Sequence, residues 1–458
     1  MTGSRNIAAR MGRWSAQHRK IAIFGWLGFV IAAFLIGNAI GTKELRSAEL
    51  GVGESGRMMK LLDKEFPEPA GERILVQSPT LTARSQEFKA VVADVVRRLE
   101  PQRDVINIRS PLDEANFNLI SDDGHSALVD FQIAGDVDAA TDKVQPILAS
   151  VTAAQAAHPS FVVEQFGDAS VEKEFEETFV KDLERAGFLS VPVTLIILIV
   201  AFGALVAAGI PLLLALSAVL ATVGLIAIPS QFLAVDAEGV SAVVLLIGLA
   251  VGVDYTMFYL KREREERAAG NDSDSALQAA AATSGRSVLI SGVTVMIAMA
   301  GMFFTGDRTF MGMAMGTILV VAVAVLGSLT VLPALLSKLG DNVERLHVPL
   351  IGRLQKKDGE GRVWSAILGP VLRYPVVSAL LAAGFLLALG AFTLQLKPAQ
   401  PGPEAFPQDM AVMKTYNKMQ AAFPGGEIPL NVVVKADDVR TGPVREAIGQ
   451  IGWRAIDS

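Results

Sequence analysis

The sequence predicts a polytopic α-helical membrane protein that carries an α/β domain outside the bilayer. The composition is 51% hydrophobic and only 19% charged. Several apolar runs are long enough to cross a hydrocarbon layer about 30 Å thick as helices. One long polar stretch between two of these runs alternates short strand-like segments with longer helix-like segments.

Seven apolar runs of about 20 residues are the candidate membrane spans. They cover Ile21–Ile40, Ala186–Phe202, Ala204–Ile228, Val240–Leu260, Val288–Phe304, Met311–Leu336 and Tyr374–Leu394. The first run follows basic residues, as a secretory signal would. It is longer than a typical signal core and lacks a clear cleavage site, so we expect a retained membrane anchor.

The basic residues predict which segments lie on each side of the membrane. Lys and Arg are concentrated before the first run, in the segment 261–267, and between residues 337 and 373. Cytoplasmic loops carry such an excess, so we expect these segments and the N-terminus to face the cytoplasm. The loop 229–239, which has no Lys or Arg, and the long segment 41–185 then lie outside.

The exterior segment 41–185 predicts a ferredoxin-like α/β domain. Its short apolar stretches are typical of strands and its longer periodic stretches of helices. In chain order they are Arg73–Gln77 (strand), Ser85–Leu99 (helix), Val105–Ile108 (strand), Ala127–Ile133 (strand), Ala139–Ala157 (helix) and Phe161–Gln165 (strand). Two β-α-β units in series match the split β-α-β pattern. A polar helix over Val171–Leu183 leads into the second span.

The chain also repeats itself. Trp14-Ser15 precedes the first span as Trp364-Ser365 precedes the seventh, and Phe66-Pro67 precedes a strand as Phe423-Pro424 precedes Leu430–Lys435. Coincidence among short matches is the alternative, but order and topology agree as well. We therefore predict that the seventh span begins a second copy, which this sequence does not complete.

These observations predict the domain organisation. It comprises a basic cytoplasmic N-terminus (1–20), a first span (21–40), an exterior domain (41–185), five further spans (186–336), a cytoplasmic linker (337–373), a seventh span (374–394) and the start of a second exterior domain (395–458).

One acid stands inside an otherwise apolar span. Asp254 lies seven residues before Lys261, which at 1.5 Å per residue puts it about 10 Å inside the helix end. A short carboxylate cannot reach water from that depth, and a charge there costs about 3 kcal/mol on insertion scales. Two interpretations stay open. Asp254 is either a group that takes up and releases protons, with Tyr255 as hydroxyl partner, or a neutral acid hydrogen-bonded to a neighbouring helix.

Small and hydroxyl residues accompany this acid. Gly248 and Gly252 form a small-xxx-small stripe beside Tyr255, along which another helix can approach closely. In the fifth span, three hydroxyl residues fall on one helical face and are candidates to support a proton relay. They are Ser287, Ser291 and Thr294. The alternative is that their hydroxyls bond back to carbonyls of their own helix.

Other site chemistry finds little support. Cysteine is absent and the four histidines are scattered, so no metal site is expected. Neither a Gly-Lys-Ser/Thr phosphate loop nor a nucleophile with its base can be assembled, so we expect no enzymatic activity. The net charge of −6 argues against a nucleic-acid partner.

The residues around Asp254 resemble a known family. The segment 248–266, GLAVGVDYTMFYLKREREE, followed by SGRSVLISG at 284–292, is similar to the mycobacterial membrane protein large (MmpL) branch of the RND transporters. The resemblance implies one RND/MmpL-type half, made of one span, an exterior porter domain and five spans, plus the start of a second repeat. It also implies that Asp254 and Tyr255 belong to a proton relay.

The family usually carries a second Asp-Tyr pair in a C-terminal half that faces the first pair across the bundle. That half is missing from this sequence, which puts independent transport in doubt. We therefore expect the missing half as a partner, either in the same chain or as a second chain. The sequence would then be a fragment, a truncated product or one half of a split transporter.

The resemblance implies export of lipids or other hydrophobic compounds driven by the proton-motive force, in the bacterial cytoplasmic membrane. Membrane lipids and a hydrophobic substrate would be the partners, and protons rather than a cofactor would drive the cycle. The oligomeric state stays open. Two alternative functions also stay open: a non-transporting membrane scaffold or sensor of the same fold, and a Sec-type protein-translocation accessory.

Overall fold

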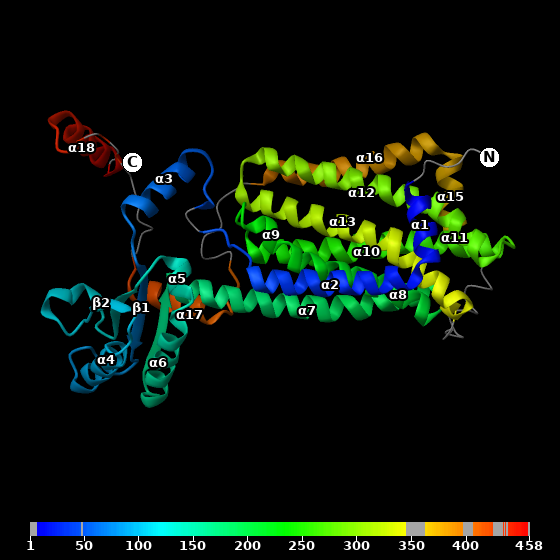
Figure 1. The fold of residues 1–458 in the computed structure, drawn as a ribbon. Coiled ribbons are helices and arrows are strands. Elements are labelled where there is room, and N and C mark those ends of the chain that lie inside the picture. The colour runs from blue at the N-terminus through cyan, green and yellow to red at the C-terminus, as the bar shows by residue number, and fades with distance from the viewer. Residues whose placement is uncertain are drawn as a thin grey trace. The chain divides into compact units, whose positions relative to one another are not determined.

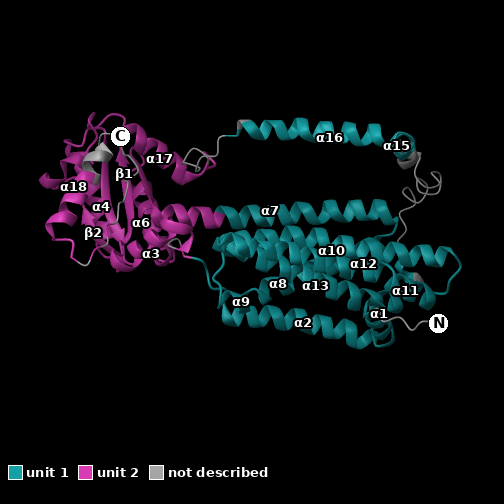
Figure 2. Ribbon diagram, turned by 90° about the horizontal axis from the view of Figure 1, so that it is seen from above, with its two compact units in different colours: residues 1–45, 178–402 teal, residues 46–177, 403–458 magenta. Residues whose placement is uncertain are grey.

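The computed structural model describes residues 7–46, 49–344, 362–396, 406–424, 434, 436 and 438–456. They belong to two compact units, one built from residues 1–45 and 178–402 and the other from residues 46–177 and 403–458 (Figures 1 and 2). The first unit is a bundle of long helices, and the second is an α/β domain.

Seven helical segments of the described chain are long and apolar enough to cross a membrane, which confirms the predicted class of polytopic membrane protein. Each overlaps one of the seven apolar runs. They are Arg19–Ile40 (α2), Asp168–Phe202 (α7), Leu205–Ser230 (α8, Leu205–Leu225, and α9, Ala227–Ser230), Ala237–Ala268 (α10), Ser273–Thr305 (α11, Ser273–Ala282, α12, Ser284–Ala300, and η3, Gly301–Thr305), Arg308–Leu339 (α13) and Pro375–Leu394 (α16, Pro375–Ala391, followed by η5, Phe392–Gln395).

Helices α8, α10 and α13 pack against one another within the bundle (Figure 1). A Cβ atom on Gly252 of α10 would lie 2.9 Å from the Cβ of Ala215 on α8, so only glycine allows the two helices to meet there. At Gly248, an added Cβ would likewise lie 2.7 Å from a methyl group of Val320 on α13. By contrast, few residues in the apolar parts of α7, α12 and α16 are buried in the described structure.

A short helix, α1 (Ile7–Gln17), precedes the first span and packs against α11, α12 and α13. Its small buried residues form the contact face, and the Ser15 hydroxyl donates a hydrogen bond to the carbonyl oxygen of Thr330. The buried residues are Ala8, Ala9, Gly12 and Ser15.

The α/β unit has the predicted ferredoxin-like fold. Its strands β1 (Ala70–Gln77), β2 (Val105–Arg109), β3 (Ser126–Ile133) and β4 (Val162–Gly167) form one antiparallel sheet in the order β2-β3-β1-β4. Helices α4 (Gln86–Leu99) and α6 (Val144–Ala157) cover one face and enclose the core. The remaining described elements are α3 (Gly53–Glu65), η2 (Glu114–Leu119), α5 (Val137–Thr141), η4 (Gly340–Glu344), α15 (Arg362–Arg373), α17 (Ala411–Ala422) and α18 (Gly442–Ile456).

Helix α17 covers part of the opposite face of the sheet. Its Met419 packs in one apolar cluster with Leu75 and Leu128. Lys418 Nζ lies 2.6 Å from Glu164 Oε1 on β4. Helix α17 follows the seventh span in the chain. It therefore completes the α/β domain, whose sheet lies between the first and second spans in the sequence.

Three predicted elements differ from the structure or fall mostly outside its described residues. The predicted helix Ala139–Ala157 is interrupted between α5 and α6, where Lys143 Nζ donates to the carbonyl oxygen of Ala134 at 2.6 Å. The polar helix predicted over Val171–Leu183 and the second span form one continuous helix, α7. The predicted strand Leu430–Lys435 falls, apart from one residue, outside the described part of the chain.

Candidate functional site

The candidate site lies on α10, which begins at a capped N-terminus and continues beyond its apolar run. The Asp236 carboxylate accepts a hydrogen bond from the backbone N–H of Gly239 at 3.0 Å, a typical N-cap. Residues at helical spacing then face the bundle interior and fix the rotation of the helix. The buried series includes Val240, Val244, Gly248, Gly252, Tyr255 and Tyr259.

Asp254 lies on the exposed side of α10. Leu246, Ala250, Asp254 and Phe258 follow one another at i+4 spacing and are all exposed in the bundle; we call these four residues the open stripe. Within the described residues, the Asp254 carboxylate makes no hydrogen bond and no ion pair. An acid is therefore the one polar side chain on a stripe that is otherwise apolar.

Tyr255 points into the bundle instead. Its side chain is only 6% exposed. It lies beside Gly292 of α12, where an added Cβ would be 3.7 Å from the phenolic oxygen. Successive residues of an α-helix differ by about 100° in direction. The structure therefore does not pair this hydroxyl with Asp254.

The three hydroxyl residues of the fifth span lie on α12 and are all exposed in the bundle. The Ser287 hydroxyl donates to the carbonyl oxygen of Thr283 at 3.4 Å, and the Thr294 hydroxyl donates to that of Ile290 at 2.9 Å. Ser291 makes no hydrogen bond through its side chain within the described part of the chain. Two of the three thus bond back to their own helix, and their part in a relay stays a prediction.

Tyr259 is a central residue that we did not single out from the sequence. It is fully buried one turn after Tyr255, and its phenol donates to the carbonyl oxygen of Leu277 at 3.4 Å. A Cβ atom on Gly12 of α1 would lie 3.3 Å from the phenolic oxygen of Tyr259, so α1 packs against this tyrosine. The i, i+4 spacing of Tyr255 and Tyr259 in the sequence could have predicted that both lie on the same face of the helix.

The α/β unit holds a buried carboxylate that sequence reasoning also missed. Glu72 is 1% exposed, and it accepts hydrogen bonds from the Gln165 side chain at 2.7 Å and from the backbone N–H groups of Ala169 and Ser170 at 2.9 Å each. Burial raises the pKa of Glu72 above its ordinary value of 4.5, against the opposing effect of these hydrogen bonds. Strand alternation with Ile74 was the signal that places Glu72 on the core face.

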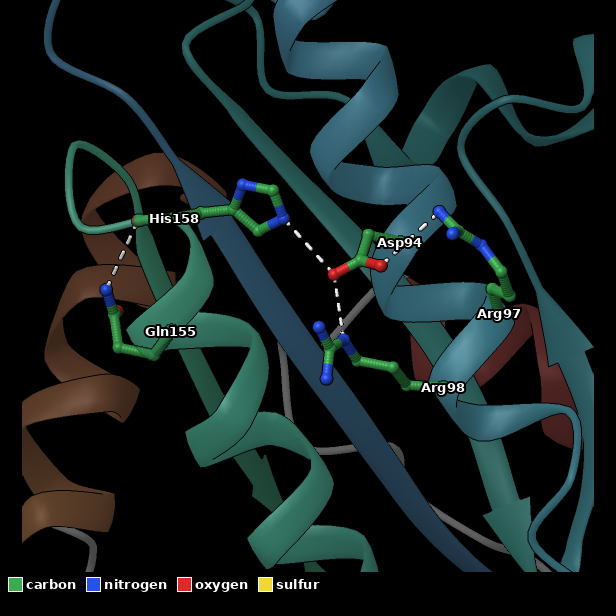
Figure 3. A network of polar contacts seen from close by, with 5 residues as sticks. All are labelled: Asp94, Arg97, Arg98, Gln155 and His158. Atoms are coloured by element: carbon green, nitrogen blue, oxygen red, sulfur yellow. Dashed lines mark hydrogen bonds and ion pairs between the residues drawn. The ribbon is translucent and has the colours of Figure 1, made fainter.

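A polar cluster joins α4 to α6 in the same unit (Figure 3). One carboxylate oxygen of Asp94 lies 3.2 Å from His158 Nε2 and 2.8 Å from Arg98 Nε, and the other lies 3.3 Å from Arg97. Partial burial disfavours the charge of Asp94, but the bonds from Arg98 and His158 outweigh it, so the pKa of Asp94 lies below its ordinary value. Among the described residues, no group of three or more His, Asp or Glu side chains is placed to hold a metal ion.

Taken together, the fold and the site define a multi-pass membrane protein with a ferredoxin-like extramembrane domain and a lone acid in one membrane helix. The model of the MMPL family matches residues 52–378, more than half of the chain. The chain therefore belongs to the MMPL family, within the RND superfamily.

Individual relatives agree with this assignment. The mycolic acid-containing lipids exporter MmpL11 of Mycolicibacterium smegmatis is 39% identical over 210 residues, which are 46% of this chain and 22% of that protein. The membrane protein YdfJ of Bacillus subtilis is 25% identical over 91% of this chain and 56% of its own length. The trehalose monomycolate exporter MmpL3 of M. smegmatis is 26% identical over 58% of this chain and 28% of its own length. The matched regions thus span roughly half or less of these relatives.

Proposed function

We propose that this chain forms part of a proton-driven exporter of lipids or other hydrophobic compounds. Membership of the MMPL family supports this substrate class. So do the names of two relatives, since MmpL11 is named as an exporter of mycolic acid-containing lipids and MmpL3 as an exporter of trehalose monomycolate. The single observation that carries the coupling proposal is the position of Asp254, which lies on the apolar open stripe without a hydrogen-bond or ion-pair partner among the described residues.

In this proposal Asp254 takes up a proton from the outer side and releases it to the cytoplasm. The neutral acid is tolerated on an apolar stripe, whereas the charged form needs water or a polar partner. The two protonation states therefore favour different surroundings of α10. One proton moving through 100 mV supplies about 2.3 kcal/mol, which shifts a two-state equilibrium roughly 50-fold.

The open stripe also supports the proposal that a further set of helices, from the same chain or a second one, covers this side of α10. A charged Asp254 facing lipid would be costly, but a covering surface could supply the polar partner that it lacks. We propose a location in the bacterial cytoplasmic membrane, in keeping with membership of the MMPL family. The distribution of Lys and Arg supports an orientation with the N-terminus in the cytoplasm. We propose protons as the coupling ion and no other cofactor.

Export by the complete gene product in proteoliposomes tests this function. The probe is a fluorescent glycolipid, and a pH gradient is imposed across the vesicle membrane. We expect gradient-dependent export in the wild type, export at background level in Asp254→Asn, and partial export in Asp254→Glu, which keeps an ionisable group. Equal thermal unfolding of all three proteins controls for folding.

Two results would overturn the proposal. Export by Asp254→Asn at the wild-type rate would remove this acid from the coupling mechanism. Failure of the gradient to move any probe in the wild type would instead favour a non-transporting scaffold or sensor on the same fold.

A further inference from the structure

A cavity of about 780 Å³ opens beside α1. Its volume falls in the range of pockets that hold small molecules. The described residues that line it are Ile7, Arg10, Met11, Arg13, Trp14, Gln17 and Thr330. Among these, all but the last come from α1, which therefore packs on the bundle with one face and presents the opposite face to the cavity.

Two guanidinium groups line this cavity, and neither has a carboxylate partner among the described residues. Arg10 and Arg13 stand one helical turn apart, and neither makes an ion pair within the described part of the chain. Within the same described residues, the Arg13 side chain donates a hydrogen bond from Nε to the carbonyl oxygen of Ala9 at 3.3 Å. No acid precedes Glu44 in the sequence. The cavity therefore has a net positive lining that suits an anion, and guanidinium groups match phosphate in geometry.

The same cavity also has apolar walls. Ile7 is 58% exposed and Trp14 is 47% exposed, although both are large apolar residues. Helix α1 leads through His18 directly into the first span, α2, which places it where the bilayer meets water. Tryptophan is enriched at that level of the membrane. A helix with basic and apolar residues on its outer face is typical of helices that lie in the interface.

We propose that this cavity binds the headgroup of an anionic phospholipid, with Arg10 and Arg13 on the phosphate and with Ile7 and Trp14 against the glycerol and upper acyl chains. A phospholipid fits better than a soluble anion, because a soluble anion would leave both apolar side chains in contact with water. The proposal concerns a lipid bound at the end of the bundle and does not depend on export or on Asp254.

Bound lipid would act on the bundle through α1. The inner face of α1 contacts buried residues of the bundle, since Gly12 lies against Tyr259 and Ser15 donates to the carbonyl oxygen of Thr330. A ligand that binds the docked helix and not the detached one stabilises the docked form by mass action. The occupied cavity therefore raises the thermal stability of the folded chain.

The test measures lipid binding to the purified chain in a zwitterionic detergent. Dioleoyl phosphatidylglycerol and dioleoyl phosphatidylcholine are titrated separately, with the unfolding temperature and native mass spectrometry as readouts. We expect selective binding of phosphatidylglycerol, weakened about fivefold by Arg10→Gln or by Arg13→Gln and roughly 30-fold by both together. Replacing both arginines with lysine keeps the charges but not the planar guanidinium geometry, so we expect weaker binding than in the wild type and stronger binding than in the double glutamine variant.

Lys338→Gln is the matched control. It removes one positive charge next to Ser337, whose carbonyl oxygen accepts a hydrogen bond from Arg19, but it does not line the cavity. We expect wild-type binding. Both arginines are exposed, so the variants should unfold like the wild type in the absence of lipid.

Three outcomes would overturn the proposal. The first is equal binding of the two lipids, and the second is full phosphatidylglycerol binding by the double glutamine variant. The third is that inorganic phosphate alone, at the same concentration, stabilises the chain as strongly as the lipid does. That last result would identify a site for free phosphate instead.

Discussion

The Glu72 carboxylate accepts a hydrogen bond from the backbone N–H of Ser170 at 2.9 Å, so that a sheet residue caps the first turn of α7. The same oxygen accepts the N–H of Ala169. A helix leaves its first N–H groups without intrahelical partners, and its positive end favours a carboxylate. In return, the Asp168 carboxylate accepts the N–H of Gly71 at 2.9 Å. The junction of β1 with α7 is thus bonded from both sides.

Truncation of Glu72 should destabilise this junction strongly. Glu72→Ala leaves three buried donors without an acceptor, and we expect a loss of about 3 kcal/mol in the stability of the unit. Glu72→Gln should cost only about 1 kcal/mol, because its amide oxygen still accepts the two backbone N–H groups. Gln165 can then turn its side-chain oxygen, which has no partner in the described structure, toward the new NH₂ group. Hydrogen exchange of the amides of Ala169 and Ser170 measures both changes, and equal protection in the two variants would contradict this account.

The raised pKa of Glu72 predicts a defined pH dependence. An acid whose pKa is higher in the folded state binds protons more tightly there, so its contribution to stability falls as pH rises from its ordinary value of 4.5 toward the raised value. The pKa of Asp94 is lowered, so its contribution to stability is constant above its ordinary value of 3.8 and is lost only as pH falls below that value. We expect the stability of the wild type relative to Glu72→Gln to decrease as pH rises from 4.5. A difference independent of pH would show that burial does not shift this group.

Helix contact at Gly252 should be intolerant of a side chain. Gly252→Val places atoms against Ala215 on α8, and overpacking of this kind costs about 1–3 kcal/mol. Gly209→Ala is the control in α8, since nothing lies within 4 Å of its added Cβ, and it should be neutral or stabilise by up to about 1 kcal/mol. Thermal unfolding in detergent compares the two. Equal effects would mean that α8 and α10 do not approach as closely as described.

Asp254 should contribute little to the stability of this chain. It has no hydrogen-bond or ion-pair partner in the described structure, so Asp254→Asn should change the free energy of unfolding by less than about 0.5 kcal/mol. A structural acid bonded to a neighbouring helix would instead lose about 1–2 kcal/mol on this change. Thermal unfolding of the chain in detergent therefore separates the two interpretations of Asp254 without any export assay.

Local sequence patterns predict most of this fold, because the spans follow from uninterrupted apolar runs and the strands from alternation. Non-local contacts decide the rest. The break before α6 is not among these contacts, because Pro146 in the first turn of α6 has no backbone N–H and cannot continue a helix from α5. The rotation of α10 is among them: the depth of Asp254 can be computed from the sequence, but which of Asp254 and Tyr255 faces the bundle depends on where α12 packs.

The position of α17 has a consequence for the order of synthesis. The sheet is complete in the growing chain once Gly167 has been made, yet the helix that covers Leu75 and Leu128 begins at Ala411. At about 5–20 residues per second, that interval lasts on the order of 10–50 s. During this time Leu75 and Leu128 are packed only against Leu119 and Phe166 of this cluster, so part of an apolar face of the sheet stays accessible to chaperones until α17 has been made.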